Sequence, residues 1–251
     1  MPAFALLLGA SAAARIASVN LCTDEYALLL ADPQQMVSVS YLSQDPLESP
    51  LWRTARRYRG NRGSLEDVLT LRPTIVLTMG GGGRATRLLA SRLHIRALDL
   101  PYANSLDDVE RNLGTVAAAF GQSGKAKPLI AEIEKLRRTA PAKASDAIWV
   151  SGRGDSLAPG SLGSQWLRVA GFHQRALHGG RVTLETLLTD PPKVLIKSNY
   201  RAGQMSGGTE WLKHPIVREA GARQIMTDGR RWTCMGPLMI PEIQRLRRLA
   251  R

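Results

Sequence analysis

The chain has 251 residues, of which 44% are hydrophobic and 5% aromatic, and its formal net charge is +13. This length is enough for one large domain or two modest ones, and no apolar run reaches the roughly 20 residues that a membrane-spanning helix needs. The arginines are scattered, few aromatic residues lie among them, and no nucleic-acid-binding motif is present. A basic solvated surface, or attraction to anionic ligands or membranes, explains the charge as well. We therefore predict no nucleic-acid partner, and a basic nucleic-acid-binding or surface-interaction protein stays as a weaker alternative.

The first fourteen residues resemble the end of a secretory signal sequence. An apolar run at 4–10 is followed by small residues, and Ala12-Ala13-Ala14 forms an A-x-A cleavage site before Arg15. The basic segment that usually precedes such a run is missing, which is consistent with a start site placed too far downstream. We expect a signal remnant at 1–14, cleavage near Ala14 and an exported mature protein. A buried N-terminal strand is the alternative.

Short strands alternate with helices along the rest of the chain. In the first half we expect helices at 26–31, 85–93 and 105–120, and strands at 16–19, 36–40, 74–77 and 95–100. In the second half we expect helices at 164–170, 210–220 and the C-terminus, and strands at 147–150, 193–196 and 223–226. This alternation predicts an α/β fold with mostly parallel sheets. Ligands of such sheets bind beyond the carboxyl ends of the strands. The loops expected there are 20–23, 41–45, 79–84, 151–161, 198–204 and 228–234.

One sequence unit occurs in both halves, at 64–77 and 183–196, and the two copies align without a gap. Each copy has a Ser or Thr that can cap a short helix, a proline that stops it and a buried strand. The period is too long for a solenoid, so two similar lobes are favoured. Glu66 and Glu185 occupy the first helical turn, where the helix dipole favours an acid. A matched pair of docking points is the alternative role for these glutamates.

A glycine loop is the one feature that argues for an enzyme. Residues 80–85 read Gly-Gly-Gly-Gly-Arg-Ala, which fits G-x-G-x-x-A between a strand and a helix, and Asp99 ends the next strand. That is the dinucleotide-binding arrangement. However, it follows the third strand rather than the first, and a run of four glycines satisfies many patterns. A dinucleotide-dependent enzyme that uses the 80–84 loop therefore stays as the alternative.

Other catalytic patterns are missing. The sequence has no P-loop, no His-Glu-x-x-His, no cysteine pairs at zinc spacing and no Gly-x-Ser-x-Gly. The four histidines are scattered. We predict no catalytic residues, no metal site and no cofactor.

Several segments together resemble a known family. In order, the chain contains Arg15-Ile-Ala-Ser-Val-Asn-Leu-Cys-Thr-Asp-Glu, Val37-Ser-Val-Ser-Tyr-Leu-Ser-Gln-Asp-Pro, both copies of the repeated unit and Trp232-Thr-Cys-Met-Gly-Pro. These segments resemble the periplasmic substrate-binding proteins of ABC importers for vitamin B12, ferric siderophores and haem, over almost the whole mature chain. The resemblance implies two α/β lobes, at 15–121 and 142–251, joined by a single long backbone helix within 122–141. It also implies a ligand held in a cleft between the lobes.

The resemblance further implies which residues meet the partner and the ligand. In this family the repeated glutamate of each lobe engages arginines of the membrane permease, which assigns docking to Glu66 and Glu185. The candidates for ligand contact are Tyr41, Arg84, Tyr200, Arg201 and Trp232, with loop packing or a solvated charge as the alternative. Arginines would suit an anionic chelate such as a ferric siderophore or the carboxylates of haem. Cobalamin would need flat apolar surfaces more.

The two cysteines, Cys22 and Cys234, fall on loops expected near the cleft. In an oxidising periplasm an even pair suggests a disulfide, which would limit lobe opening if it bridged the lobes. Unpaired buried thiols, or ligands to a bound metal complex, are the alternatives, so Cys22 is also a candidate for ligand contact. We therefore predict a monomeric, non-catalytic periplasmic protein that captures a metal chelate and delivers it to an ABC importer permease.

Overall fold

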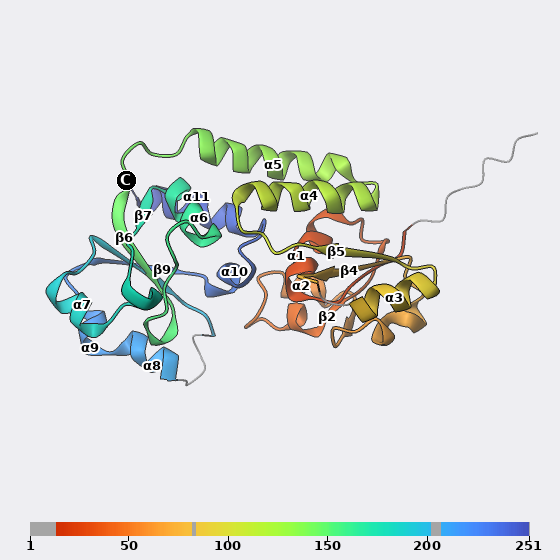
Figure 1. Cartoon of the computed structure of the whole chain (residues 1–251), viewed down its shortest axis with the longest axis horizontal. Coiled ribbons are helices and arrows are strands. Elements are labelled where there is room, and N and C mark those ends of the chain that lie inside the picture. The colour runs from red at the N-terminus through yellow and green to blue at the C-terminus, as the bar shows by residue number, and fades with distance from the viewer. Residues whose placement is uncertain (1–13, 82–83, 202–206, 251) are drawn as a thin grey trace, which may run out of the picture.

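The computed structural model describes residues 14–81, 84–201 and 207–250, which form two α/β lobes (Figure 1). The signal-like segment lies outside the described residues except for Ala14. The first sheet has the order β3-β2-β1-β4-β5, and the second has the order β7-β6-β8-β9. All strand pairs in both sheets are parallel, which confirms the predicted fold class. The strands are β1 Ile16–Ser18, β2 Met36–Ser40, β3 Arg59–Asn61, β4 Ile75–Met79, β5 Arg96–Leu100, β6 Ser145–Val150, β7 Phe172–Gln174, β8 Val194–Ser198 and β9 Arg223–Thr227.

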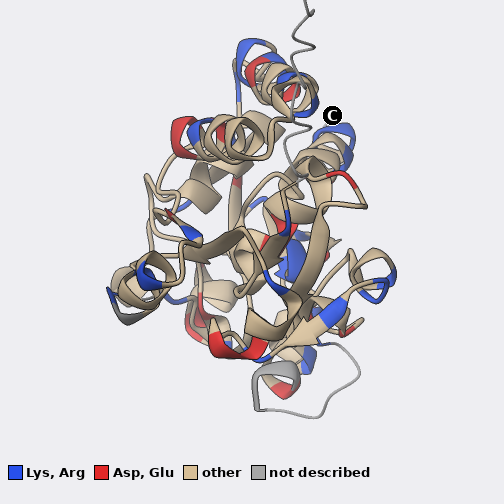
Figure 2. Cartoon of the chain, turned by 90° about the vertical axis from the view of Figure 1, so that its right-hand side faces the viewer, with Lys and Arg blue, Asp and Glu red and all other residues tan. Residues whose placement is uncertain are grey.

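Helices cover both sheets and connect the strands. In the first half they are α1 Leu21–Leu30, η1 Tyr41–Gln44, α2 Trp52–Ala55, η2 Glu66–Leu71, α3 Arg84–Arg92, α4 Leu106–Phe120 and α5 Ser123–Arg138. In the second half they are η3 Gly152–Gly154, α6 Leu162–Ala170, η4 His178–Gly180, α7 Leu184–Thr189, α8 Gly207–Lys213, α9 Pro215–Arg218, α10 Gly229–Cys234 and α11 Met239–Leu249. None of the helices in the described part of the chain is long and apolar enough to cross a membrane. Lysines and arginines lie on many of these elements rather than on one face (Figure 2).

Alternate residues of the central strands face two different cores. In β8, Val194 and Ile196 belong to one large cluster that runs through both lobes, whereas Leu195 belongs to a separate cluster under α7 and α9. In β4, Ile75 and Leu77 face the same large cluster. This alternation follows from the two-residue period of a strand. The large cluster therefore joins the lobes, and each lobe keeps its own outer cluster.

The repeated unit covers the outer face of each sheet. Leu65 and Val68 of the first copy and Leu187 of the second are buried in the outer clusters. As predicted, the capping hydroxyls accept hydrogen bonds from first-turn amides, Ser64 from Asp67 at 3.2 Å and Thr183 from Thr186 at 3.1 Å.

Two helices lie across the junction of the lobes. α4 ends at Gly121, whose φ of 71° allows the chain to turn, and α5 returns beside it (Figure 1). α5 is the element expected within 122–141, but it is paired with α4 rather than standing alone. The Arg247 side chain of α11 donates a hydrogen bond to the hydroxyl of Thr139 at 2.7 Å, which fixes the far end of α5 to the second lobe.

Several local predictions were wrong. α1 begins at Leu21 rather than at residue 26, because the Asn20 side chain accepts a hydrogen bond from the Cys22 amide at 2.9 Å and caps the helix. The segment 228–234, expected as a loop, contains α10, which Asp228 caps in the same way. The edge strands β3 and β7 were missed because three residues carry little periodic signal. The helix expected at 210–220 is divided in two before Pro215.

Candidate ligand site between the lobes

A disulfide crosses the junction of the two lobes. It joins Cys22 in the first turn of α1 to Cys234 at the end of α10, with 5.3 Å between the two Cα atoms. The cysteines therefore lie on helices, not on the loops expected from the sequence. Because both sulfurs are bonded to each other, neither is a free thiolate for a metal complex.

Two buried acids follow Cys22 on α1. Asp24 accepts hydrogen bonds from the hydroxyls of Ser40 and Ser43, both at 2.5 Å. Burial nevertheless raises the pKa of Asp24 to about 7, because desolvation outweighs these hydrogen bonds. Glu25 is only 4% exposed, and burial raises its pKa to about 8.

The side chain of Glu25 packs against Gly236 of the second lobe. A Cβ atom added to Gly236 would lie 2.6 Å from the carboxylate oxygen Oε2 of Glu25, so a larger residue here would require the Glu25 carboxylate to move. The same Oε2 atom has no hydrogen-bond partner among the described residues. A neutral carboxyl group is therefore packed in the interface between the lobes.

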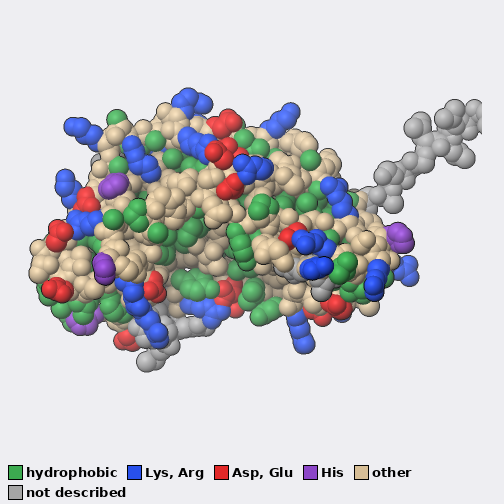
Figure 3. All heavy atoms as spheres, viewed as in Figure 1, with side chains coloured by type: hydrophobic (Ala, Val, Ile, Leu, Met, Phe, Trp, Pro, Cys, Tyr) green, Lys and Arg blue, Asp and Glu red, His purple; other side chains and the backbone are tan. Residues whose placement is uncertain are grey.

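A cavity of about 450 Å³ lies between the lobes beyond the carboxyl end of β9. The first lobe contributes Pro46 and Leu47; the second contributes Asn199, Arg201, Met226, Thr227, Asp228, Arg230, Glu242 and Arg245. Hydrophobic side chains are visible around the hollow between the lobes in Figure 3. The lining is therefore amphipathic, with three arginines beside Leu47 and Met226.

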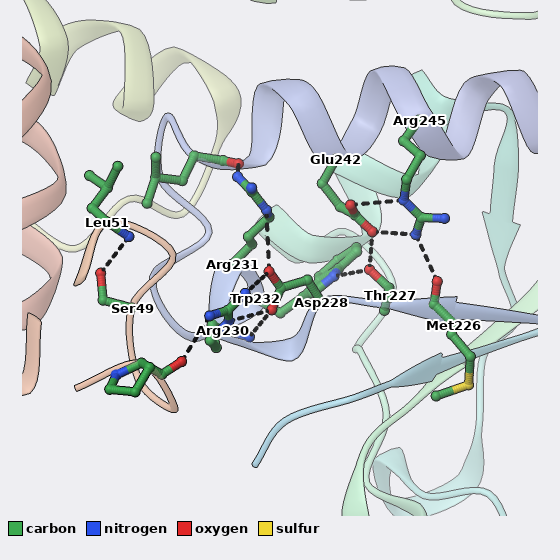
Figure 4. Close-up of polar contacts among 12 residues, drawn as sticks. Ser49, Leu51, Met226, Thr227, Asp228, Arg230, Arg231, Trp232, Glu242 and Arg245 are labelled. Carbon is green, nitrogen blue, oxygen red and sulfur yellow. Dashed lines mark hydrogen bonds and ion pairs between the residues drawn. The ribbon is translucent and has the colours of Figure 1, made fainter. Parts of the chain in front are cut away.

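Ion pairs fix two of the arginines in this cavity (Figure 4). Arg230 contacts both carboxylate oxygens of Asp228 at 2.8 Å and donates to the carbonyl of Pro46, in the other lobe, at 2.8 Å. Arg245 contacts Glu242 at 2.5 Å. Burial alone would raise the pKa of the Glu242 carboxyl, but hydrogen bonds from Arg245 and Thr227 hold it below its usual value. Both acids are thus ionised partners that hold the guanidinium groups in place.

A second contact between the lobes lies at the edge of this cavity. Glu48, which is 4% exposed, accepts a hydrogen bond from the hydroxyl of Tyr200 and forms an ion pair with Arg201. Two sequence-predicted residues thus meet an acid of the opposite lobe. Arg201 lines the interlobe cavity, and Tyr200 lines an adjoining cavity of about 270 Å³.

The remaining ligand candidates lie apart from the interlobe cavity. Tyr41 is 57% exposed and lines a third cavity of about 700 Å³, beside Gly60 and Arg62 of the first lobe. Arg84 begins α3 and belongs to none of these three linings.

Trp232 is a core residue in this structure. Its side chain is 3% exposed, its indole N–H donates to the hydroxyl of Thr227 at 2.7 Å, and its ring lies 5.2 Å from that of Trp149. A side chain this buried presents no surface to a ligand, so we leave Trp232 out of the proposed contacts.

Sequence reasoning did not single out several residues that line the interlobe cavity. Asp228 and Arg230 directly follow β9, so the carboxyl-end rule already pointed to their segment. Glu242 and Arg245 lie on α11, far along the chain, and only the tertiary structure brings them to the cavity. Within the described part of the chain, no group of three or more His, Cys, Asp or Glu is placed to hold a metal ion.

The two repeated glutamates are solvent-exposed on opposite lobes. Glu66 lies in the first turn of η2 and Glu185 in the first turn of α7. Among the described residues, neither carboxylate forms an ion pair. Both are therefore available to a partner.

The glycine loop has a packing role at its described end. A Cβ atom at Gly80 would lie 2.1 Å from the ring of Tyr102, so this glycine makes room for the tyrosine. The acid expected to bind a ribose, Asp99, already accepts a hydrogen bond from Thr78 at 2.7 Å and pairs with Arg87 at 3.3 Å. Gly82 and Gly83 lie outside the described residues.

Neither a family model nor a curated protein sequence matches this chain. Solved structures, however, match it over almost its whole length. The periplasmic haem-binding protein HutB of Vibrio cholerae superposes with a TM-score of 0.72 at 18% identity, covering 94% of this chain and 98% of its own. A periplasmic haem-binding protein from Pseudomonas aeruginosa gives 0.69 at 20% identity, with 94% and 92% covered. The periplasmic vitamin B12-binding protein BtuF of Vibrio cholerae gives 0.62 at 18% identity, with 94% and 97% covered. The chain therefore has the two-lobed fold of these periplasmic binding proteins, the class that its sequence resembles.

Proposed function

We propose that this protein is an exported solute-binding protein that captures a metal chelate and delivers it to the permease of an ABC importer. The observation that carries the proposal is the interlobe cavity of about 450 Å³, in a chain whose fold matches structures of haem-binding and vitamin B12-binding proteins. The chelate is a haem, a corrinoid or a ferric siderophore. The signal-like segment that ends near Ala14 supports a periplasmic location, and we expect the mature protein to act as a monomer.

The lining of the cavity fits an amphipathic ligand. Arg201, Arg230 and Arg245 can hold acidic groups through charge-assisted hydrogen bonds, while Leu47 and Met226 provide apolar contact. Tyr200 and Arg201 already contact Glu48, so a ligand that enters between the lobes competes with that contact. Tyr41, in a separate cavity of the first lobe, is a further proposed contact. The protein binds and releases its ligand without changing it.

Docking to the permease is assigned to Glu66 and Glu185. One exposed carboxylate on each lobe, at equivalent positions of the repeated unit, suits a partner with two matching basic sites. Such a pair fixes orientation more than it adds affinity.

The ligand is tested by thermal unfolding of the mature protein with cobalamin, cobinamide, several ferric siderophores, haem and NAD. A ligand that binds only the folded state raises the unfolding midpoint with concentration, by the equivalent of about 2.7 kcal/mol at one hundred times Kd. We expect this with a metal chelate, and we expect Arg230→Met to weaken the effect while the surface variant Arg168→Met does not. A shift with NAD alone would support the dinucleotide enzyme, and no shift with any chelate would contradict the proposal.

Docking is tested separately by charge reversal. Glu66→Arg and Glu185→Arg should abolish ligand uptake through the permease in reconstituted vesicles while the affinity for the ligand stays unchanged. Glu134→Arg, on the exposed side of α5, is the matched control and should leave uptake intact. Uptake at the wild-type rate in the double variant would exclude these residues as docking points.

A further inference from the structure

The cavity of about 270 Å³ beside the interlobe site is lined by three cations. It lies at the carboxyl end of β8 and is bounded by Lys197, Ser198, Asn199, Tyr200, Leu212, Lys213, Arg218 and Met226. Lys197 of β8 is paired in register with Met226 of β9. Lys197 lies two residues after Leu195, so both side chains point to the face that α8 and α9 cover.

Among the residues that the structure describes, no acidic side chain lines this cavity. Lys213, at the exposed rim, pairs with Glu210 at 3.1 Å. Lys197 is half-buried and forms no ion pair in the described part of the chain. The segment 202–209, which follows Arg201, contains no Asp or Glu in its sequence. Among the described residues, the positive charges of Lys197 and Arg218 are therefore not neutralised by ion pairs with carboxylates, whereas that of Lys213 is.

The position of Lys197 is electrostatically unfavourable without an anion. Burial lowers the pKa of its ammonium group, and the like charge of Arg218 lowers it further. A half-buried cation beside another cation is costly unless a counter-charge is present. An anion in the cavity would remove this cost and would contact both side chains.

We propose that this cavity is an anion-binding site that takes the carboxylate or phosphate group of an amphipathic molecule, with Lys197 as its central charge. Arg218 and Lys213 complete the charge at the rim, and the Asn199 side chain provides a neutral polar group. Leu212 and Met226 form the apolar wall, which favours an acid attached to a hydrophobic body over a free inorganic ion.

The site also defines the class of transported ligand, an inference that rests on the proposed function. The 270 Å³ and 450 Å³ cavities share Asn199 and Met226 in their linings. A chelate held between the lobes can therefore extend an acidic arm into the basic cavity. This favours a carboxylate-bearing chelate, such as haem or an acidic ferric siderophore, over corrinoids, whose side chains are amides.

The anion site itself is tested by NMR of ¹³C-dimethylated lysines. The chain has only seven lysines, and single Lys→Arg variants assign their signals. Titration with sodium acetate, and separately with inorganic phosphate, should give a saturable shift of the Lys197 signal and a raised pKa for that amine. Lys193, an exposed residue at the other end of β8, is the internal control. A Lys197 signal that moves no more than the Lys193 signal with either anion would overturn the proposal.

The ligand class is tested with haem and cobinamide on Lys197→Met and its control Lys193→Met. Lys197→Met removes a charged hydrogen-bond partner and should weaken haem binding about tenfold or more, whereas Lys193→Met should not. Neither variant should change the affinity for cobinamide. Equal haem affinity in both variants would show that the acidic arm lies elsewhere, even where the NMR titration supports the anion site. A protein that binds no chelate but titrates with acetate or phosphate would refute the transport role and keep the anion site. Saturation by phosphate but not acetate would point to a phosphate-bearing ligand.

Discussion

Replacement of Glu25 by glutamine should change how the stability of the protein depends on pH. Glu25 is buried at the junction of the lobes, and burial raises the pKa of its carboxyl from 4.5 to about 8. The folded state therefore binds this proton more tightly than the unfolded state does. The resulting stabilisation is complete below about pH 4.5 and is lost as the pH rises toward 8.

The size of this pH effect follows from the shift in the pKa of Glu25. Each pKa unit corresponds to about 1.4 kcal/mol, so Glu25 accounts for a loss of about 3 kcal/mol in the free energy of unfolding between pH 5 and pH 7.5. Asp24, whose pKa is raised to about 7, changes in the same direction. Glutamine has nearly the same shape and no charge at either pH. Between pH 5 and pH 7.5, the free energy of unfolding of the Glu25→Gln variant should therefore fall by about 3 kcal/mol less than that of the wild type.

Urea unfolding of the oxidised protein at pH 5 and pH 7.5 measures this difference. Any pH-independent cost of the amide cancels, because only the change with pH is compared. Glu134→Gln, which removes an exposed carboxylate from α5, should follow the wild type. If Glu25→Gln declined with pH as steeply as the wild type, the carboxyl group would not be held neutral in the folded state, and the reasoning from burial would be refuted.

Three further comparisons of variants test other parts of the structure. The double change of Cys22 and Cys234 to serine should lower the free energy of unfolding by about 2–5 kcal/mol, and reductant should then have no further effect, as urea titrations can show. Trp232→Phe should cost about 1 kcal/mol through its lost hydrogen bond and leave ligand affinity unchanged in calorimetry; weakened binding would return this residue to the site. Gly80→Ala should be less stable than Gly81→Ala, which has a similar positive φ but no neighbour within 4 Å. Equal thermal midpoints for the two glycine variants would mean that the tyrosine ring moves aside.

The arrangement of the two lobes could be predicted because its signals are local. The repeated unit contains a capping hydroxyl, a short helix, a proline and a buried strand, and each of these depends on residues a few positions apart. Because the unit occurs twice, η2 and α7 lie on equivalent faces of the two sheets. The short edge strands and the start of α1 were missed because they depend on a pairing partner and on one capping side chain, Asn20.

The candidate site was harder to predict because its residues come from distant segments. Tyr200 and Arg201 follow a strand and line cavities at the junction of the lobes, and their contact with a ligand stays a prediction. The acid that both contact, Glu48, lies about 150 residues earlier in the chain. Trp232 was expected on a loop, where its side chain could reach a ligand. In the structure Asp228 caps a helix in this segment, and the indole of Trp232 lies in the core. A pattern of residue types does not show which side of a helix faces a cavity.

The contacts between the lobes bear on how a ligand enters. A hinge needs a junction with few packed contacts, yet here one hydrophobic cluster runs through both lobes and a disulfide joins α1 to α10 close to the buried Glu25. Wide separation of the lobes would expose that cluster and is blocked by the covalent link. The contacts at the cavity edge are different in kind, since Arg230 reaches Pro46, and Tyr200 and Arg201 reach Glu48, through polar groups that water or a ligand can replace. Entry of the proposed ligand would therefore require rearrangement of the 45–50 and 199–201 segments rather than rotation of one lobe away from the other.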